Sequence, residues 1–385
     1  MMRVEVKPSL LRWARYRAGL DLDDLARRFP RLADWESGER RPTIRQLEEF
    51  AKATRTPVGY LFLTEPPTER VPIPDLRTIG NRRIEHPSPD LLDTIYLCQQ
   101  RQEWYRDFAR SQRDESLRFV GSATLRNDVQ ETAALIRDQL GFDLDARRQM
   151  PTWTEALRRF IEQADAIGVL VMVNGVVSNN NYRKLDPDEF RGFALSDPLA
   201  PLVFINGADT KAAQMFTLAH EIAHIWLGQS ALSDIAPISM PTHDVERWCN
   251  EVAAELLVPL AVLRSEIRRN EELRDALDRL ARRFKVSTLV ILRRIHDVGV
   301  LKKEQFWRAY QEELDRLRAI AKSSGGDFYL TQAARVGKRF ARALVTSTLE
   351  GQTLHRDAFR LLGFSKLATF RELGHSLGLA QWPTS

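Results

Sequence analysis

The chain has 385 residues, of which 43% are hydrophobic and 28% charged, and a net charge of +5; this composition suits two or three folded domains and excludes a disordered chain. No apolar run reaches the roughly 18 residues of a membrane span, and charges stand where a secretory signal is apolar, so we expect a cytoplasmic protein without membrane contact. Cys98 and Cys249 lack CxxC spacing, which excludes a disulfide framework and a cysteine zinc site.

Residues 1–63 are predicted to form a module of short helices. Apolar residues recur at helical spacing over 8–19, 21–29 and 43–54. The segments LRWARYRAGLDLDDLA and WESGERRPTIRQLEEFAKATRTPVGYLF resemble the Cro/C1-type (Xre) helix-turn-helix domain. This resemblance implies DNA binding. Five arginines are candidate contacts to nucleic-acid phosphates: Arg27, Arg28, Arg31, Arg40 and Arg41.

The middle of this module is short for a helix-turn-helix domain. Only eight residues separate Ala26 from Trp35, roughly four fewer than a turn and a recognition helix occupy. A helix shortened by about one turn cannot present the same side chains to a major groove. Two interpretations follow: the arginines meet DNA phosphates, or the shortened module serves homodimerisation or the docking of a protein partner.

A linker is predicted over residues 64–87. The prolines of its first half cannot continue a helix: Pro66, Pro67, Pro72 and Pro74. Beyond the linker, apolar periodicity predicts helices over 88–112, 127–140 and 153–166, with a polar loop between the last two.

Three short segments are predicted to be strands, over 167–173, 190–195 and 202–205. Each is rich in branched or aromatic residues and is bounded by Gly, Pro, Asn or Asp. From residue 209 onward the pattern is helical, with a break at 323–326. The fold class that follows is mainly α with a small β-sheet (α+β).

One helix carries the pattern on which the functional prediction depends. Residues 211–228 contain no proline, end on a glycine and include the sequence His220-Glu221-Ile222-Ala223-His224. Histidines four residues apart project from one face of a helix, so their ring nitrogens can bind a single ion. Glu221 beside them could take a proton from a water molecule at the metal and pass it to a leaving amine. A pair of packed core histidines is the alternative unless a third ligand lies nearby.

The segment ERWCNEVAAELLVP, about 22 residues further on, offers that third ligand. Glu246 and Asn250 lie four residues apart, so Asn250 could accept the ring N–H of a ligating histidine when Glu246 binds the metal. Glu251 and Glu255 form a second pair on another face, and we favour Glu246. Two histidines and a glutamate with an open fourth position are typical of catalytic zinc. The same hard ligands also suit manganese or iron.

These segments carry a specific resemblance. FTLAHEIAH followed by ERWCNEVAAELLVP, with PLVFINGADTKAAQMFTLAHE before it, resembles the ImmA/IrrE family of bacterial metallopeptidases over roughly residues 165–300. The resemblance implies a zincin-like domain, which with its leading helices spans 88–300. It also implies a zinc ion held by His220, His224 and Glu246, with Glu221 as the general base.

Substrate binding in such a peptidase needs further groups. A tyrosine or histidine usually stabilises the oxyanion, and His243 and Tyr182 are both candidates. Peptidases of this kind often hold an extended substrate on the edge strand beside the metal helix, and residues 202–206 are the candidate strand.

Residues 301–385 are predicted to form a helical, basic C-terminal region. The net charge is about −9 over 61–260 and +10 over 261–385. This contrast favours nucleic-acid contact by the basic part or contact between the two segments, and solvated Arg-rich helices give the same pattern. Residues 280–295 also read as helix, turn, helix, and ImmA/IrrE relatives carry a similar segment as part of their fold.

Two functions fit these observations. The leading hypothesis is a regulatory zinc-dependent endopeptidase that cleaves a specific intracellular protein, such as a repressor or an antitoxin-like regulator. The alternative is a transcriptional regulator or antitoxin in which the peptidase fold serves recognition of DNA or a partner. A Glu221→Gln variant separates the two hypotheses, because it removes the base and leaves the predicted metal ligands in place.

Overall fold

The computed structural model describes residues 3–76, 87–233, 243–268, 270–321 and 335–379. Contacts divide the chain into two units, one of residues 1–72 and 84–96, the other of residues 73–83 and 97–385. Much of the linker predicted over 64–87 and the break predicted at 323–326 lie outside the described residues.

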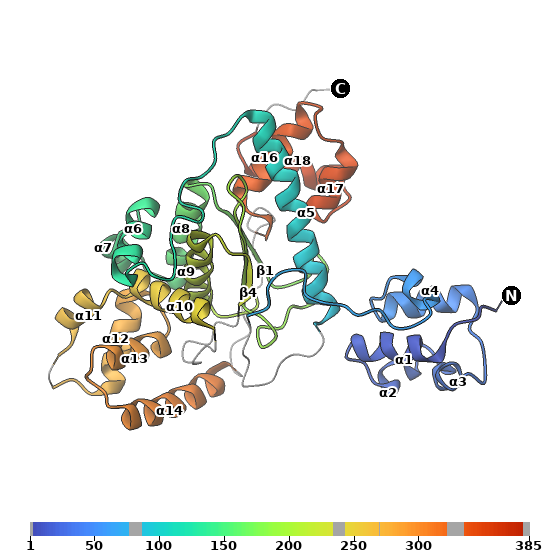
Figure 1. Ribbon diagram of the computed structural model, residues 1–385, viewed down its shortest axis with the longest axis horizontal. Coiled ribbons are helices and arrows are strands. Elements are labelled where there is room, and N and C mark those ends of the chain that lie inside the picture. The colour runs from blue at the N-terminus through green and yellow to red at the C-terminus, as the bar shows by residue number, and fades with distance from the viewer. Residues whose placement is uncertain (1–2, 77–86, 234–242, 269, 322–334, 380–385) are drawn as a thin grey trace. The chain divides into compact units, whose positions relative to one another are not determined.

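The first unit is a set of short helices around an apolar core (Figure 1). Its elements are α1 Pro8–Arg17, α2 Leu22–Ala26, α3 Leu32–Ser37, α4 Ile44–Ala53 and the 3-10 helix η1 Val58–Phe62. Pro8 suits the first turn of α1, where no backbone donor is needed. Thr43 Oγ1 accepts the Gln46 amide at the start of α4. The helix α3 lies between the helices predicted over 21–29 and 43–54. It has six residues, little more than one and a half turns.

A buried ion pair joins α1 to α3. Arg15 Nε and Nη2 donate to the two carboxylate oxygens of Glu36 at 2.8 and 3.0 Å, and both side chains are buried. The hydrogen bond that Arg15 donates to Glu36 raises the pKa of Arg15 above its ordinary value. A bidentate pair fixes direction as well as distance, so it holds α3 in one orientation.

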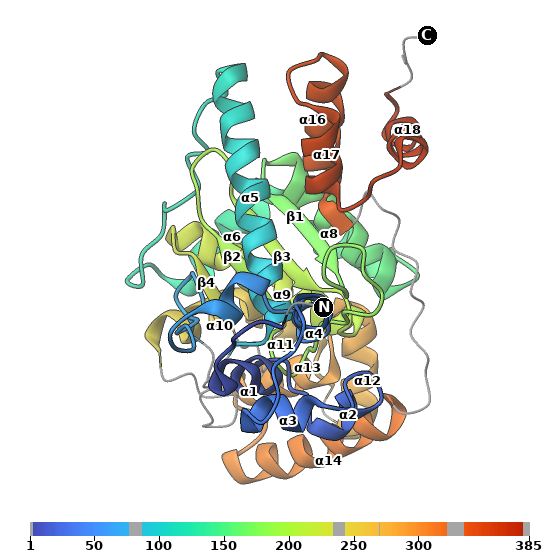
Figure 2. The same ribbon diagram turned by 90° about the vertical axis from the view of Figure 1, so that its right-hand side faces the viewer.

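The second unit is built on a four-stranded sheet (Figure 2). Its strands are β1 Leu170–Asn174, β2 Gly192–Leu195, β3 Leu202–Asn206 and β4 Ala231–Ser233. They lie in the order β1-β3-β2-β4, with β1 and β3 parallel and the other pairs antiparallel. In this register Phe193 pairs with Phe204 on one side and Leu232 on the other.

The prediction that residues 202–206 form the edge strand is wrong. β3 is bonded to β1 on one side and to β2 on the other, and each of its residues is buried. The edge strand next to β2 is β4, which the sequence did not reveal because three residues are too few to show an alternating pattern.

Helices cover both faces of the sheet (Figures 1 and 2). On one face α8 Trp153–Ala166 and α9 Lys211–Leu227 pack against inward-facing side chains that include Val203 and Ile205. The other face holds Phe193 and Phe204, whose rings stack at 5.0 Å. There the second half of α5 Pro89–Gln112 crosses the sheet, and Gln102 donates to the carbonyls of Leu195 and Ala200. α16 Lys338–Leu349 packs against β1.

The remaining elements are helical and confirm a mainly α protein with a small mixed sheet. They are α6 Val129–Leu140, α7 Leu144–Gln149, α10 Asp244–Leu257, α11 Leu260–Glu266, α12 Leu273–Phe284, α13 Thr288–Asp297, α14 Lys303–Ala321, α17 His355–Leu362 and α18 Leu367–Ser376. The stretch predicted as a loop before α8 contains α7, because Asp143 Oδ1 accepts the amides of Asp145 and Ala146 and starts a short helix. Among the described residues, none of the helices combines the length and apolar character needed to cross a membrane.

Candidate metal centre

The helix α9 places the predicted ligands inside the second unit. Thr210 Oγ1 accepts the Ala213 amide at its start, and Gly228, with a φ of +70°, ends it. The helix packs against β2, β3, α8 and α10. Its surroundings are apolar on most sides, so His220, Glu221 and His224 are all fully buried.

Three side chains converge between α9 and α10. His224 Nε2 lies 3.1 Å from His220 Nε2 and 3.0 Å from Glu246 Oε1, and His220 Nε2 lies 3.3 Å from Glu246 Oε2. Four ligand atoms bound tetrahedrally to zinc at about 2.0–2.2 Å are separated by about 3.3–3.6 Å. The observed separations fit such a set, with one position left open.

Asn250 orients the ring of His220 through the nitrogen that does not face the other ligands. Its Oδ1 lies 2.9 Å from His220 Nδ1, one turn of α10 beyond Glu246. A ring N–H donated to this oxygen leaves Nε2 of His220 without a proton and directed at the other two ligands. An unprotonated nitrogen beside a second histidine nitrogen and a carboxylate is a donor set for a cation. These residues therefore fit a divalent metal ion.

The charges in the centre respond to burial and to one another. Burial lowers the pKa of His224. Burial acts to raise the pKa of Glu246, but the two histidines outweigh it and lower that pKa to about 2. Neutral histidine and ionised glutamate are the forms that bind a metal.

Glu221 lies beside the triad. Both of its carboxylate oxygens are buried and have no hydrogen-bond partner among the described residues. Burial, with the charge of Glu246, raises its pKa well above the ordinary value, although the side chain of Ser233 acts in the opposite direction. On the sheet side, a Cβ at Gly192 would stand 3.2 Å from Glu221 Oε1, so the glycine leaves room for this carboxylate.

Ser233 is a residue of the centre that the sequence did not indicate. Its Oγ lies 3.2 Å from His224 Nε2, and it is fully buried at the end of β4. A serine in a three-residue strand carries no spacing signal that would have marked it. Its position shows that the edge strand β4 runs directly past the metal ligands.

The other candidate residues lie elsewhere. Glu255 is buried in an ion pair with Arg294, and Glu251 is exposed on α10. Tyr182 is 94% exposed, and His243 is exposed just before α10. Among the contacts of the described residues, neither Tyr182 nor His243 touches the three ligands, and the choice of an oxyanion-stabilising group stays open.

The candidate phosphate contacts lie on the surface of the first unit. All five side chains are exposed: Arg27, Arg28, Arg31, Arg40 and Arg41. Arg40 pairs with Asp34 and Arg41 with Glu5, each at 3.5 Å. Exposed pairs of this length are weak, so both arginines are available to an anion.

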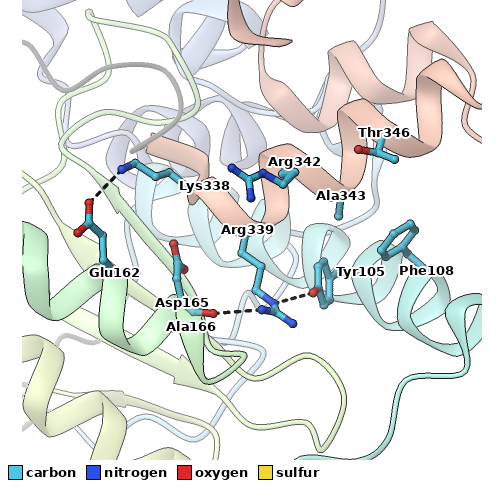
Figure 3. Close-up of a pocket in the computed structure, with 10 residues that line it drawn as sticks. All are labelled: Tyr105, Phe108, Glu162, Asp165, Ala166, Lys338, Arg339, Arg342, Ala343 and Thr346. Carbon is cyan, nitrogen blue, oxygen red and sulfur yellow. Dashed lines mark hydrogen bonds and ion pairs between the residues drawn. The ribbon is translucent and has the colours of Figure 1, made fainter. Parts of the chain in front are cut away.

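A pocket of about 510 Å³ lies apart from the triad, between α5, α8 and α16 (Figure 3). Arg339 donates to Tyr105 Oη at 2.8 Å and to the Asp165 carbonyl at 3.2 Å, and Lys338 pairs with Glu162 at 3.2 Å. Because these cations are already paired, the pocket acts mainly as a polar joint between α16 and the sheet-covering helices.

Two segments of the chain match known families. Residues 164–296 match the IrrE N-terminal-like domain, a peptidase domain of family M78. Residues 336–376 match a domain of unknown function, DUF8813. No curated protein matches the chain significantly. The chain thus contains an M78 peptidase domain with a buried His220, His224 and Glu246 triad able to hold a metal ion, consistent with a zinc metallopeptidase. The match includes the segment 280–295, which belongs to this domain.

Proposed function

We propose that the protein is a regulatory zinc-dependent endopeptidase that cleaves a specific intracellular protein, such as a repressor or an antitoxin-like regulator. The observation that carries the proposal is Glu221, a buried carboxylate with no partner among the described residues, beside the His220, His224 and Glu246 triad. A packed pair of core histidines would need no such carboxylate. Zinc is proposed over manganese or iron because two histidines and one carboxylate are its usual catalytic set.

The residues divide the work of peptide hydrolysis. His220, His224 and Glu246 would hold the metal, and Asn250 orients the ring of His220. A bound zinc ion supplies Lewis acidity, which polarises the scissile carbonyl and makes water more acidic. Glu221 accepts a proton from the attacking water and then donates it to the amine of the departing fragment. Burial raises the pKa of Glu221, which strengthens it as a base and makes its protonated form available as the acid.

The test uses the full-length protein. We expect about one zinc ion per chain, lost in His220→Ala and Glu246→Ala. Glu221→Gln should keep the zinc and lose at least about 100-fold in cleavage rate, the usual contribution of a general base. Glu251→Gln, on the exposed side of α10, is the matched control and should cleave normally.

The substrate has to be identified in the same series. Proteins retained by zinc-loaded Glu221→Gln from cell extract are identified by mass spectrometry and then incubated with the wild-type chain. Cleavage of a retained protein by the wild type alone supports the proposal. Equal cleavage by Glu221→Gln and the wild type contradicts the role of Glu221 as the base.

A DNA- or partner-binding regulator is the second candidate function. What supports it is the exposure of the five arginines of the first unit and the resemblance of its sequence to a helix-turn-helix domain. The six residues of α3 argue against base readout, because a recognition helix normally reaches several bases. We therefore propose that this unit docks a partner or a second copy of the chain. A gel-shift with the full chain at moderate salt tests DNA: a sequence-specific shift, weakened by Arg27→Ala and Arg31→Ala, would favour the regulator.

A further inference from the structure

The outer edge of β4 is occupied by residues of the same chain. The Leu232 amide donates to the Pro74 carbonyl at 2.9 Å, and the Leu76 amide donates to the Leu232 carbonyl at 3.0 Å. Asp75 thereby forms a parallel bridge with Leu232, and Ile73 is buried. Residues 73–76, named here the covering segment, extend the sheet by one short strand beyond β4.

The covered edge is the one beside the metal ligands. Ser233, next to Leu232 in β4, has its Oγ 3.2 Å from His224 Nε2. The neighbouring strand β2 carries Gly192, whose position faces Glu221. The other edge of the described sheet, β1, is separated from β4 by two strands. An extended peptide that pairs with the sheet and reaches the triad must therefore pair with β4.

We propose that the covering segment closes the peptide-binding edge of the metal centre, and that an extended stretch of the substrate protein takes its place on β4 by strand addition. This inference rests on the proposed peptidase function. It adds a step of regulation before cleavage, in which a segment of the chain itself occupies the peptide-binding edge. Backbone hydrogen bonds to an exposed sheet edge are a general mode of peptide recognition.

The covering segment is paired with β4 through few hydrogen bonds, so it can dissociate from the edge. Pro74 has no amide hydrogen and Pro72 precedes the segment, so the chain cannot build a longer ladder on β4. Two backbone hydrogen bonds at Leu232 and the buried side chain of Ile73 hold the segment on β4. An extended substrate segment can form the same two bonds with the Leu232 amide and carbonyl.

The position of the segment in the chain provides a means of control. The first stretch of the first unit ends at Pro72, and the covering segment begins at the next residue. A partner that binds the first unit and changes the course of the chain near Pro72 would therefore act directly on the segment. The helix-rich first unit would then serve as a sensor that uncovers the edge.

The test compares two ligands on zinc-loaded full-length protein. Acetohydroxamate needs the metal alone, whereas Pro-Leu-Gly-hydroxamate also needs an open edge strand. Leu76→Pro removes the amide that donates to Leu232, and Leu76→Ala is the matched control that keeps it. Hydrogen exchange of the Leu232 amide reports whether the segment has left β4. Ile73→Asp, which places a charge at a buried position, releases the segment by a second route.

We expect faster exchange at Leu232 in Leu76→Pro and Ile73→Asp, and about tenfold tighter binding of Pro-Leu-Gly-hydroxamate, the effect of one or two regained backbone hydrogen bonds. Acetohydroxamate should bind all variants alike, and Leu76→Ala should resemble the wild type. Faster exchange without tighter peptidyl binding overturns the inference, as does unchanged exchange in both variants. Failure of acetohydroxamate to bind any form overturns the proposed zinc site itself.

Discussion

At the scale of single residues, Gly192 shows how closely the sheet approaches the proposed base. A Cβ at this position would lie 2.6 Å from Thr217 Cγ2, 2.8 Å from the Phe204 carbonyl oxygen and 3.2 Å from Glu221 Oε1. The first two separations are shorter than van der Waals contact, and one involves backbone that cannot turn away. Glycine is therefore needed for close packing of α9 on the sheet.

We expect Gly192→Ala to lower the free energy of unfolding by about 1–3 kcal/mol, as overpacking does in cores. It should also reduce cleavage, because Thr217 and Glu221 share one helix. Chemical denaturation and the cleavage assay measure the two effects. Gly59→Ala is the control, since a Cβ there meets nothing within 4 Å. Equal stability of both variants would show that β2 can move away from α9.

The residues of the metal centre differ in how visible they are in the sequence. The spacing of His220, Glu221 and His224 on one helix marks them in the sequence. On the second helix the same spacing offers two pairs, of which the favoured one, Glu246 with Asn250, is the pair found at the centre. Periodicity works for them because both helices are long enough to define a face. Ser233 and Gly192 reach the centre through strand pairing, which depends on register between distant segments. No local pattern predicts that register.

At the scale of elements, the same distinction holds. The long helices α5, α6, α8, α9 and α10 lie within two residues of their predicted bounds at most ends. The sequence did not predict the short elements α7 and β4, because so few residues show no periodicity. The short helix α3 forms because its apolar side chains are buried against α1. The error about the edge strand came from the strand order. Even without β4, the order β1-β3-β2 places β3 in the middle of the sheet, and no local pattern predicts this order.

The ion pair between α1 and α3 predicts a large effect in the first unit. Glu36→Ala leaves the buried guanidinium of Arg15 without its carboxylate, and removal of one partner of a buried pair costs about 3–5 kcal/mol. We expect faster hydrogen exchange throughout α1 and α3 and earlier unfolding of this unit in denaturant. Asp34→Ala breaks the exposed pair with Arg40 and should cost less than about 1 kcal/mol. Similar losses in the two variants would contradict a structural role for the buried pair.

At the scale of the whole chain, the segment that matches DUF8813 packs on the M78 domain through the joint of Figure 3. Asp165 at the end of α8 lies in this joint, facing Arg339 and Lys338 of α16, with the Val171 amide at 3.5 Å. Burial raises the pKa of Asp165 to about 7, although the two cations and the amide act in the opposite direction. The carboxyl group is therefore protonated in the folded chain over a range where it is ionised in the unfolded chain.

This difference fixes the sign of a pH dependence. A carboxyl group whose pKa is raised on folding binds its proton more tightly in the folded state, so its contribution to stability falls as the pH rises from about 4 to about 7 and is constant above. Since one pKa unit corresponds to about 1.4 kcal/mol and water still reaches the partly buried group, we expect a loss of about 2 kcal/mol over this range. Asp165→Asn cannot ionise and should lack the loss.

Chemical denaturation of the wild type and Asp165→Asn between pH 5 and pH 8 measures the difference. The two proteins should approach each other in stability at the acidic end, and the variant should be the more stable at the alkaline end. Glu162→Gln, on the same helix and paired with Lys338 at the surface of the joint, controls for loss of charge and should not reproduce the effect. A wild type that gains stability relative to Asp165→Asn with rising pH would mean that Arg339 and Lys338 hold the carboxylate in its ionised form. The joint would then be an ion-pair contact, and its strength would fall with added salt.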